Sequence, residues 1–176
     1  MKNTKTITNI GLLTAMALAI SLIEHSIPVP VPIPGVKLGL SNMVLLLALY
    51  IYGFKVALTV AILKSFLLML ITGSVTAFFY SFAGAILASC TMAISLKYFT
   101  KVFSFVGISE IGAFFHNFGQ ILIAAIVMGS IKMYIYFPAL VIMGVITSFF
   151  VGLSVNYIAN HMDKVKLGAN LDEKNY

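Results

Sequence analysis

Long apolar runs separated by short polar segments set the pattern of this chain. Runs such as residues 43–51 and 66–71 contain no charged position, and with their flanks of small residues they extend to about 20 residues, the length of a helix that crosses a membrane. The strands of a membrane barrel would instead alternate apolar and polar side chains over about ten residues. The pattern therefore predicts an all-α integral membrane protein.

Six transmembrane helices fit these runs, in one domain whose sequence shows no repeat, no linker and no soluble module. We expect the helices at residues 7–26, 38–52, 54–72, 76–99, 108–130 and 133–160. The second helix is short for a bilayer, which indicates that the chain at residues 34–38 dips into the membrane edge. We interpret residues 1–162 as the transmembrane domain and residues 163–176 as a polar cytoplasmic tail.

The composition agrees with a membrane location. Of the 176 residues, 61% are hydrophobic and 9% are charged, whereas a soluble domain carries about 25% charged residues. Mean hydropathy is +1.07. This balance excludes an ordinary soluble enzyme, a disordered chain and a disulfide scaffold. The single cysteine, Cys90, is expected to be an inert packing residue.

The net charge of +6 arises from lysine alone and predicts the topology. Lys64 lies within a predicted span. If the N-terminus is cytoplasmic, the lysines outside the cell are only Lys37 and Lys132. The remaining lysines then lie in the cytoplasm: Lys2, Lys5, Lys55, Lys97, Lys101, Lys164, Lys166 and Lys174. The positive-inside rule favours this orientation, with both termini cytoplasmic in a bacterial plasma membrane. The lysines form no patch, so we expect membrane lipids and no nucleic acid as partners.

Motifs of catalysis and nucleotide binding are missing from the sequence. The nucleotide-binding pattern G-x-x-x-x-G-K-[ST] does not occur, and no serine lies in a nucleophile elbow. The aspartates, Asp163 and Asp172, both lie in the tail, so no aspartate pair can hold the magnesium of an allylic diphosphate. His116 has no His or Cys partner at metal-ligand spacing. We expect a protein that is not an enzyme and uses no cofactor or metal. Uphill transport would require a partner or an ion gradient.

The loop after the first predicted helix is unusual because it is both stiff and apolar. Its alternating prolines enforce an extended path without internal hydrogen bonds, and all the side chains between them are apolar. The residues concerned are Pro28, Pro30, Pro32 and Pro34, followed by Gly35. We interpret the loop as a lid that gates a pocket. The alternative is a rigid connector that packs on the helix ends.

Three ionisable residues interrupt the first and third predicted helices. Such residues in or beside a membrane span are costly and indicate function. Glu24 and His25 end the first helix, where simple solvation at the interface is the alternative. Lys64 lies near the middle of the third, where we expect it to face the bundle interior and pair with a carboxylate of the protein or of a ligand. The alternatives for Lys64 are a purely structural pair or snorkelling to the surface.

The fifth predicted helix carries the densest polar group. His116 and Gln120 are four residues apart and share one helix face, with Asn117 beside it. Imidazole and amide groups need partners in a medium of low dielectric constant. They are therefore expected either to line a site for a substrate or quinone head group, or to hold the helices together by hydrogen bonds.

Small residues recur at four-residue spacing, which lets helix backbones approach closely. In the sixth predicted helix, Gly144, Ser148 and Gly152 are expected to pack inside the bundle. In the first, Ala15 and Ala19 fit internal packing and docking of another protein equally well.

Two segments resemble the marks of a known family. PGVKLGLSN at residues 34–42 and HNFGQ at residues 116–120 look like motifs of the Gx transporter family, which also carries the label heptaprenyl diphosphate synthase component I. The resemblance covers nearly the whole chain. That family is similar in fold to the substrate-binding S components of energy-coupling factor (ECF) transporters, which are six-helix membrane proteins with cytoplasmic termini.

The resemblance implies roles for particular residues. Ala15 and Ala19 match the A-x-x-x-A pattern by which S components dock on a transmembrane coupling protein that works with ATPases, and residues 28–37 match the loop that caps the substrate. Members of the family are also associated with flavin-based extracellular electron transfer and demethylmenaquinone pathways, together with a NusG-like extracytoplasmic protein. The synthase label implies prenyl diphosphate metabolism.

The favoured hypothesis is an S component-like subunit that captures a small, partly apolar, anionic molecule such as a prenyl or quinone precursor. In this hypothesis Lys37 and Lys64 neutralise the anion. The other candidate binding residues are Asn42, Asn117 and Gln120, which would orient the head group, and Glu24, His25 and His116. Two alternatives remain: a quinone-interacting subunit of an electron-transfer chain, with a lipid-accessible cleft at the fifth helix, and a membrane accessory component of heptaprenyl diphosphate synthase.

Overall fold

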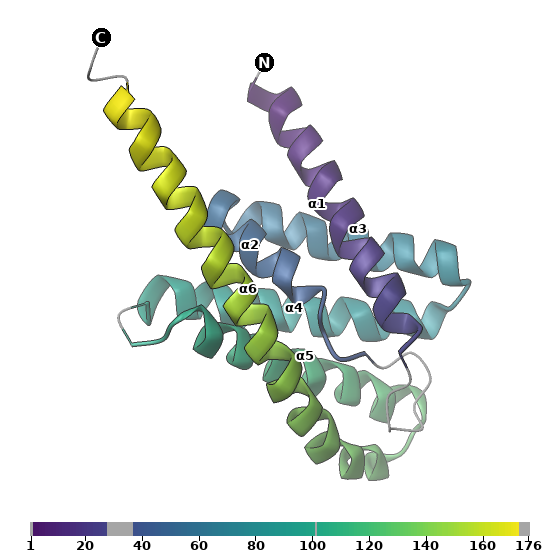
Figure 1. Ribbon diagram of the computed structural model, residues 1–176. Coiled ribbons are helices and arrows are strands. Elements are labelled where there is room, and N and C mark those ends of the chain that lie inside the picture. Colours follow the sequence, from purple (N-terminus) through teal and green to yellow (C-terminus); the bar gives the residue numbers. More distant parts are fainter. Residues whose placement is uncertain (1, 28–36, 101, 173–176) are drawn as a thin grey trace.

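The protein folds into a helical bundle, shown by a computed structural model that describes residues 2–27, 37–100 and 102–172 (Figure 1). The elements are α1 (Lys2–His25), α2 (Asn42–Tyr52), α3 (Phe54–Thr72), α4 (Val75–Tyr98), α5 (Phe105–Val127), the 3₁₀ helix η1 (Ile131–Tyr136) and α6 (Phe137–Asp172). No strand occurs in these residues. The predicted all-α membrane fold is confirmed.

The second helix is shorter than the sequence pattern predicts. In the described parts of the chain, five helical segments are long and apolar enough to cross a membrane, and α2 is not among them. With 11 residues, α2 is about 16 Å long, roughly half of a hydrocarbon core of about 30 Å. The sixth predicted helix is η1 followed by α6, which continues without a break past residue 162 to Asp172. The division into a domain and a tail at that residue stays a prediction.

The chain returns to its starting side through α2. Figure 1 shows the first turn of α1 and the last turn of α6 at the same end of the molecule. Glu24, near the other end of α1, accepts a hydrogen bond from the amide of Leu40, just before α2 (3.1 Å). At the far end of α2, the hydroxyl of Tyr50 donates to Asp163 of α6 (2.9 Å). The segment from residue 37 to Tyr52 therefore runs back towards the end that carries both termini.

The short helix α2 forms the centre of the bundle. It contacts each of the long helices α1, α3, α4, α5 and α6. Each residue from Val44 to Leu49 is buried, so that α2 is covered on all sides. A helix that is hydrophobic all round is expected in such a core position. The second predicted span is therefore a core helix, and the long helices separate all but its C-terminal end from the membrane.

Small residues allow the long helices to approach one another. A Cβ atom on Gly152 of α6 would lie 2.4 Å from the Cα of Val106 in α5, and one on Gly144 would lie 2.4 Å from Nδ2 of Asn117. The main-chain oxygen of Ser148 accepts a hydrogen bond from Ser109 of α5 (2.9 Å). The predicted internal packing of this face of α6 is confirmed.

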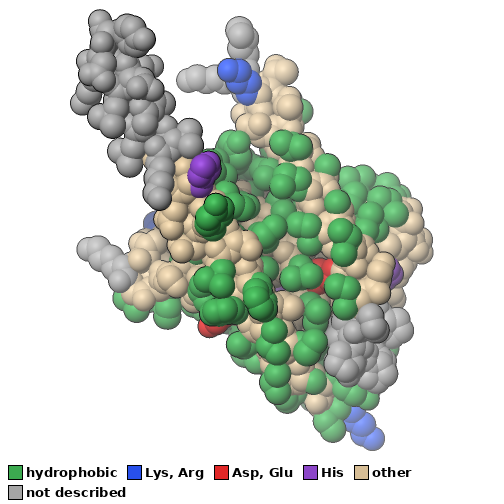
Figure 2. Space-filling model, in the orientation of Figure 1, with side chains coloured by type: hydrophobic (Ala, Val, Ile, Leu, Met, Phe, Trp, Pro, Cys, Tyr) green, Lys and Arg blue, Asp and Glu red, His purple; other side chains and the backbone are tan. Residues whose placement is uncertain are grey.

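The outer surface suits a lipid environment. Large apolar side chains lie exposed on the long helices, including Leu12, Leu70, Ile94, Ile126, Ile142 and Phe150. Figure 2 shows hydrophobic side chains spread over the visible face, whereas the most prominent lysines lie towards its upper and lower ends. In water this surface would be a large apolar patch. In a bilayer it matches the hydrocarbon region.

Candidate functional site

Polar and charged side chains meet inside the bundle around the chain that leads into α2. We call this group the polar cluster: Glu24, Lys37, Ser41, Lys64, Ser81, His116 and Gln120. Six of them line one small closed space, and Glu24 joins them through its interactions with the lysines. The residues come from α1, α3, α4, α5 and the segment before α2. All are buried, with 1% of Lys64 and 2% of His116 exposed. The prediction that Lys64 faces the bundle interior is confirmed, whereas its pairing with a carboxylate stays a prediction, since its ammonium group bonds Ser41.

Helix geometry places Lys64 and His116 of the polar cluster near the middle of their spans, whereas Glu24 lies in the last turn of α1. Lys64 follows the start of α3 by ten residues, or about 15 Å along the helix. His116 follows the start of α5 by eleven residues, or about 16 Å. Both distances are close to half of a hydrocarbon core of about 30 Å. The α2 helix begins at the same depth, so the bundle contains a half-length helix whose N-terminus lies beside the charged groups.

The charges in the polar cluster do not balance when both lysines are protonated. The Nζ atom of Lys64 donates to Oγ of Ser41 (2.9 Å), and Nζ of Lys37 donates to the main-chain oxygen of Ser21 (2.9 Å). Glu24 interacts electrostatically with both lysines and accepts hydrogen bonds from the amides of Gly39 and Leu40.

The other carboxylates whose side chains the structure describes belong to different regions. Glu110 lies in the second turn of α5, and Asp163 lies in the C-terminal part of α6, where it bonds Tyr50. Two buried cations therefore face one buried anion. Buried charges are stable in proteins when they are paired. An added anion would complete the pairing.

Gln120 holds the polar cluster closed. Its Oε1 atom accepts from the main-chain amide of Lys37 (2.7 Å), and its Nε2 atom donates to the main-chain oxygen of the same residue (3.0 Å). Thr147 of α6 donates to the oxygen of Leu38 (3.3 Å). These bonds fix the end of the predicted lid between α5 and α6. The remaining space is too small for a water molecule.

Asn42 and Asn117 are also buried but do not line the space inside the polar cluster. Both polar atoms of the Asn42 side chain are buried and have no hydrogen-bond partner among the described residues. A Cβ atom on Gly39 would lie 2.9 Å from Nδ2 of Asn42 and 3.2 Å from the ring of His116, so Gly39 keeps these two side chains close to the chain before α2. Asn117 donates instead to the oxygen of Leu140 in α6 (2.8 Å), and its own oxygen has no partner.

The remaining predicted site residues lie elsewhere. His25 is exposed at the end of α1 and does not join the polar cluster. Ala15 and Ala19 are exposed on the outer face of α1, four residues apart. The predicted gate residues lie outside the described residues: Pro28, Pro30, Pro32, Pro34 and Gly35. The binding roles of all these residues stay predictions.

Two serines of the polar cluster are not singled out in the sequence. Ser41 accepts the hydrogen bond of Lys64, and Ser81 pairs with Ser65 (3.0 Å). Serine is common in the apolar runs of this chain, so its presence alone identifies no site. The useful signal for Ser41 is its place beside Asn42, directly before a helix that begins within the membrane.

A charged cluster enclosed by membrane helices defines the class: an integral membrane protein with a buried polar centre. The chain belongs to the heptaprenyl diphosphate synthase component I family, whose model matches residues 13–158. No curated protein and no solved structure matches the chain. The predicted family is confirmed, and its likeness to S components of ECF transporters stays a prediction.

Proposed function

We propose that this protein is a membrane-embedded binding subunit that captures a small, partly apolar anion in the polar cluster. The observation that carries the proposal is the pair of buried lysines, Lys37 and Lys64, which face one buried carboxylate, Glu24, in the described part of the chain. An anionic head group would supply the missing negative charge. The unpartnered amide of Asn42 and the imidazole of His116 would orient that head group, as polar groups orient ligands in buried pockets.

Binding would require the closed segment before α2 to open. Breaking the two bonds between Gln120 and the main chain of Lys37 would release the end of the loop that contains the predicted gate. The ligand would enter from the side of the membrane opposite the termini, since that loop follows the C-terminal end of α1. Gln120 would then be free to bond the ligand in place of Lys37.

The family label narrows the ligand class. A prenyl diphosphate combines an apolar chain with an anionic head, and an acidic quinone precursor has the same character. Both would place the head group on Lys37 and Lys64 and the apolar part among the surrounding helices. The sequence carries no aspartate pair for diphosphate chemistry, so we propose a binding role without catalysis.

The first test measures binding to the purified protein in lipid nanodiscs. Farnesyl diphosphate and 1,4-dihydroxy-2-naphthoate are the anionic probes, and farnesol is the neutral control. We expect an anionic probe to bind, and Lys64→Met to weaken its binding about 10–100-fold, because a hydrogen bond to a charged group contributes about 1.5–3 kcal/mol. Lys55→Met, at an exposed lysine of α3, is the matched control. Equal binding of farnesol, or full binding by Lys64→Met, would contradict the proposal.

We further propose that partner proteins drive the transport of the captured molecule, as in ECF transporters. The sequence contains no nucleotide-binding motif, so ATP hydrolysis would occur in a partner. The exposed alanines Ala15 and Ala19 of α1 provide a smooth face on which the helix of a transmembrane coupling protein would pack. We take the end that carries both termini as cytoplasmic, in agreement with the distribution of lysines.

The second test is purification of the tagged protein from its native membrane. We expect a transmembrane coupling protein and two ATPases to accompany the chain, and Ala15→Trp to remove them, because the bulky ring would separate the two helices. Ile142→Trp, at a position of α6 with 63% of the side chain exposed, is the control that should retain them. Recovery without any ATPase would contradict the transport proposal.

Membership in the family favours a second candidate, an accessory membrane subunit of heptaprenyl diphosphate synthase. In that role the polar cluster would hold the diphosphate head of a substrate or product while a separate, aspartate-rich subunit carries out the chemistry. The same purification distinguishes the two candidates. Recovery of a soluble prenyl synthase in place of the ATPases would support this second role.

A further inference from the structure

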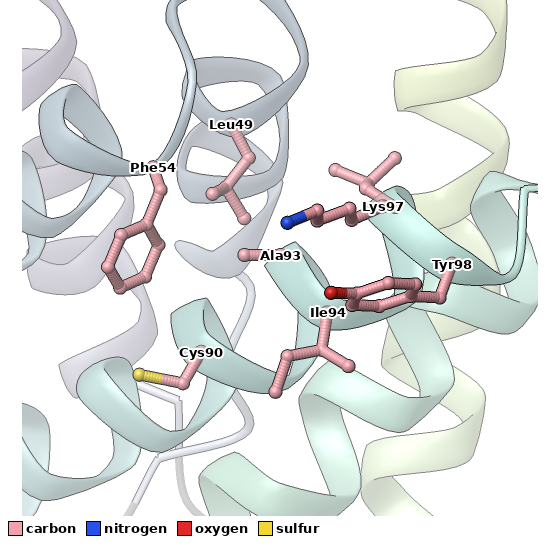
Figure 3. A pocket seen from close by; sticks show the side chains of 8 residues that line it. Leu49, Phe54, Cys90, Ala93, Ile94, Lys97 and Tyr98 are labelled. Atoms are coloured by element: carbon pink, nitrogen blue, oxygen red, sulfur yellow. The ribbon is translucent and has the colours of Figure 1, made fainter.

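A second site candidate lies on the outer surface, away from the polar cluster. A groove of about 580 Å³ opens between the end of α2, the start of α3 and the C-terminal half of α4 (Figure 3). Its walls are almost entirely apolar and are formed by Leu49, Phe54, Cys90, Ala93, Ile94 and Leu96. A volume of this size is typical of ligand pockets. The shape and lining suit a hydrocarbon chain.

One end of the groove is polar. Lys97 and Tyr98 complete the lining, and Figure 3 shows the ammonium group of Lys97 and the hydroxyl of Tyr98 both pointing into the groove. The Nζ atom of Lys97 lies 5.1 Å from the centre of the Tyr98 ring, which is within the range of a cation–π interaction. In the described parts of the chain, Lys97 contacts no carboxylate. The groove therefore presents a cation beside an apolar channel.

Aromatic side chains place this polar end at the membrane interface. Tyr52 and Phe54 lie at the junction of α2 and α3, with 43% and 41% of their side chains exposed, and Tyr98 ends α4 with 66% exposed. Exposed tyrosines and lysines at helix ends are typical of the boundary between head groups and hydrocarbon. From that boundary the groove extends along α4 towards Cys90, into the hydrocarbon region.

We propose that this groove binds an anionic phospholipid. One acyl chain lies along the apolar wall, the lipid phosphate pairs with Lys97, and the hydroxyl of Tyr98 donates to a phosphate oxygen. Basic pockets between transmembrane helices bind lipid head groups in this way. A partner helix is a poorer occupant, because it would cover Lys97 without the negative charge that a phosphate brings. The site is separate from the polar cluster and does not depend on the proposed function.

The absence of tryptophan from the sequence provides a direct test. The variant Phe54→Trp places a single fluorophore in the groove, and Phe150→Trp places one on a lipid-facing position of α6, where 62% of the native side chain is exposed. Each variant is reconstituted into phosphatidylcholine vesicles with increasing dibrominated phosphatidylglycerol or dibrominated phosphatidylcholine. Bromine quenches only a tryptophan that touches the lipid, so the curves give the relative affinity of each lipid at each position.

We expect phosphatidylglycerol to bind at residue 54 about fivefold more tightly than phosphatidylcholine, the effect of one lysine on an anionic lipid. Adding Lys97→Gln should reduce the ratio of the two lipid affinities at residue 54 to about one. Adding Lys132→Gln, which removes an exposed lysine of η1, should leave this ratio unchanged.

Three results would overturn the proposal. The first is the same preference at residues 54 and 150, and the second is a preference that does not respond to Lys97→Gln. The third is release of brominated phosphatidylglycerol by micromolar farnesyl diphosphate, which would assign the groove to a prenyl diphosphate.

Discussion

Glu24→Gln is expected to destabilise the protein by about 3–5 kcal/mol, the cost of leaving a buried charge uncompensated. Glu24 is the carboxylate that faces Lys37 and Lys64 inside the bundle. Glutamine keeps a side-chain oxygen for the amides of Gly39 and Leu40, so the substitution removes the charge and little else. The measurement is the free energy of unfolding in mixed micelles by denaturant titration.

Two further variants separate charge from other effects of this substitution. Glu110→Gln removes a half-buried carboxylate outside the polar cluster and should change the stability by less than about 1 kcal/mol. Adding Lys64→Met to Glu24→Gln removes one of the two unpaired cations and should restore much of the lost stability. Wild-type stability in Glu24→Gln alone would show that the buried lysines do not depend on this carboxylate.

Gly152→Val is expected to destabilise the protein by about 3 kcal/mol, the upper range for overpacking of a core. A Cβ atom at this position would lie 2.4 Å from the Cα of Val106 and 2.9 Å from its main-chain nitrogen. Backbone atoms cannot turn aside as a flexible side chain can, so α5 and α6 would have to separate. The hydrogen bond between Ser109 of α5 and the main chain of Ser148 of α6 lies one turn away and should weaken as the two helices separate.

The matched control is Gly11→Val on the outer face of α1. No atom lies within 4 Å of a Cβ placed on Gly11. The same change of side chain in a transmembrane helix should therefore alter the free energy of unfolding by less than about 0.5 kcal/mol. Similar losses at both positions would mean that the contact between α5 and α6 does not determine the effect.

Buried polar residues could be predicted from the sequence where they interrupt apolar runs. Lys64 and Gln120 stand out because a charge or an amide within an apolar run needs a partner, and the structure buries both inside the bundle. The long helices could also be predicted, because an apolar run of about 20 residues indicates a helix that crosses a membrane. The prediction of six spans was less accurate for α2, which was expected to be short but still to lie among the membrane-spanning helices. An apolar helix has the same composition whether lipid or other helices surround it, so α2 could not be recognised as a core helix.

The partners of the polar side chains could not be predicted. Gln120 bonds the main chain of Lys37 across 83 residues of sequence, and a main-chain group carries no signature of the residue that will bond it. Asn117 and Gln120 belong to the same motif, yet Asn117 bonds α6 and Gln120 bonds the segment before α2. The direction of each side chain depends on the packing of the helices, which periodicity in a single sequence leaves open.

The short length of α2 has a consequence for the biogenesis of the protein. The long helices are apolar enough to enter the bilayer one at a time, as independent spans do. The segment from Lys37 to Tyr52 carries buried polar groups that are satisfied by Ser21, Glu24 and Gln120 on other helices. This segment can adopt its final position only after those helices are present. Gln120 is synthesised long after α2. Assembly of the polar cluster is therefore a late step in folding. Cellular quality control that degrades proteins with misplaced membrane segments would also remove chains in which the polar cluster has not formed.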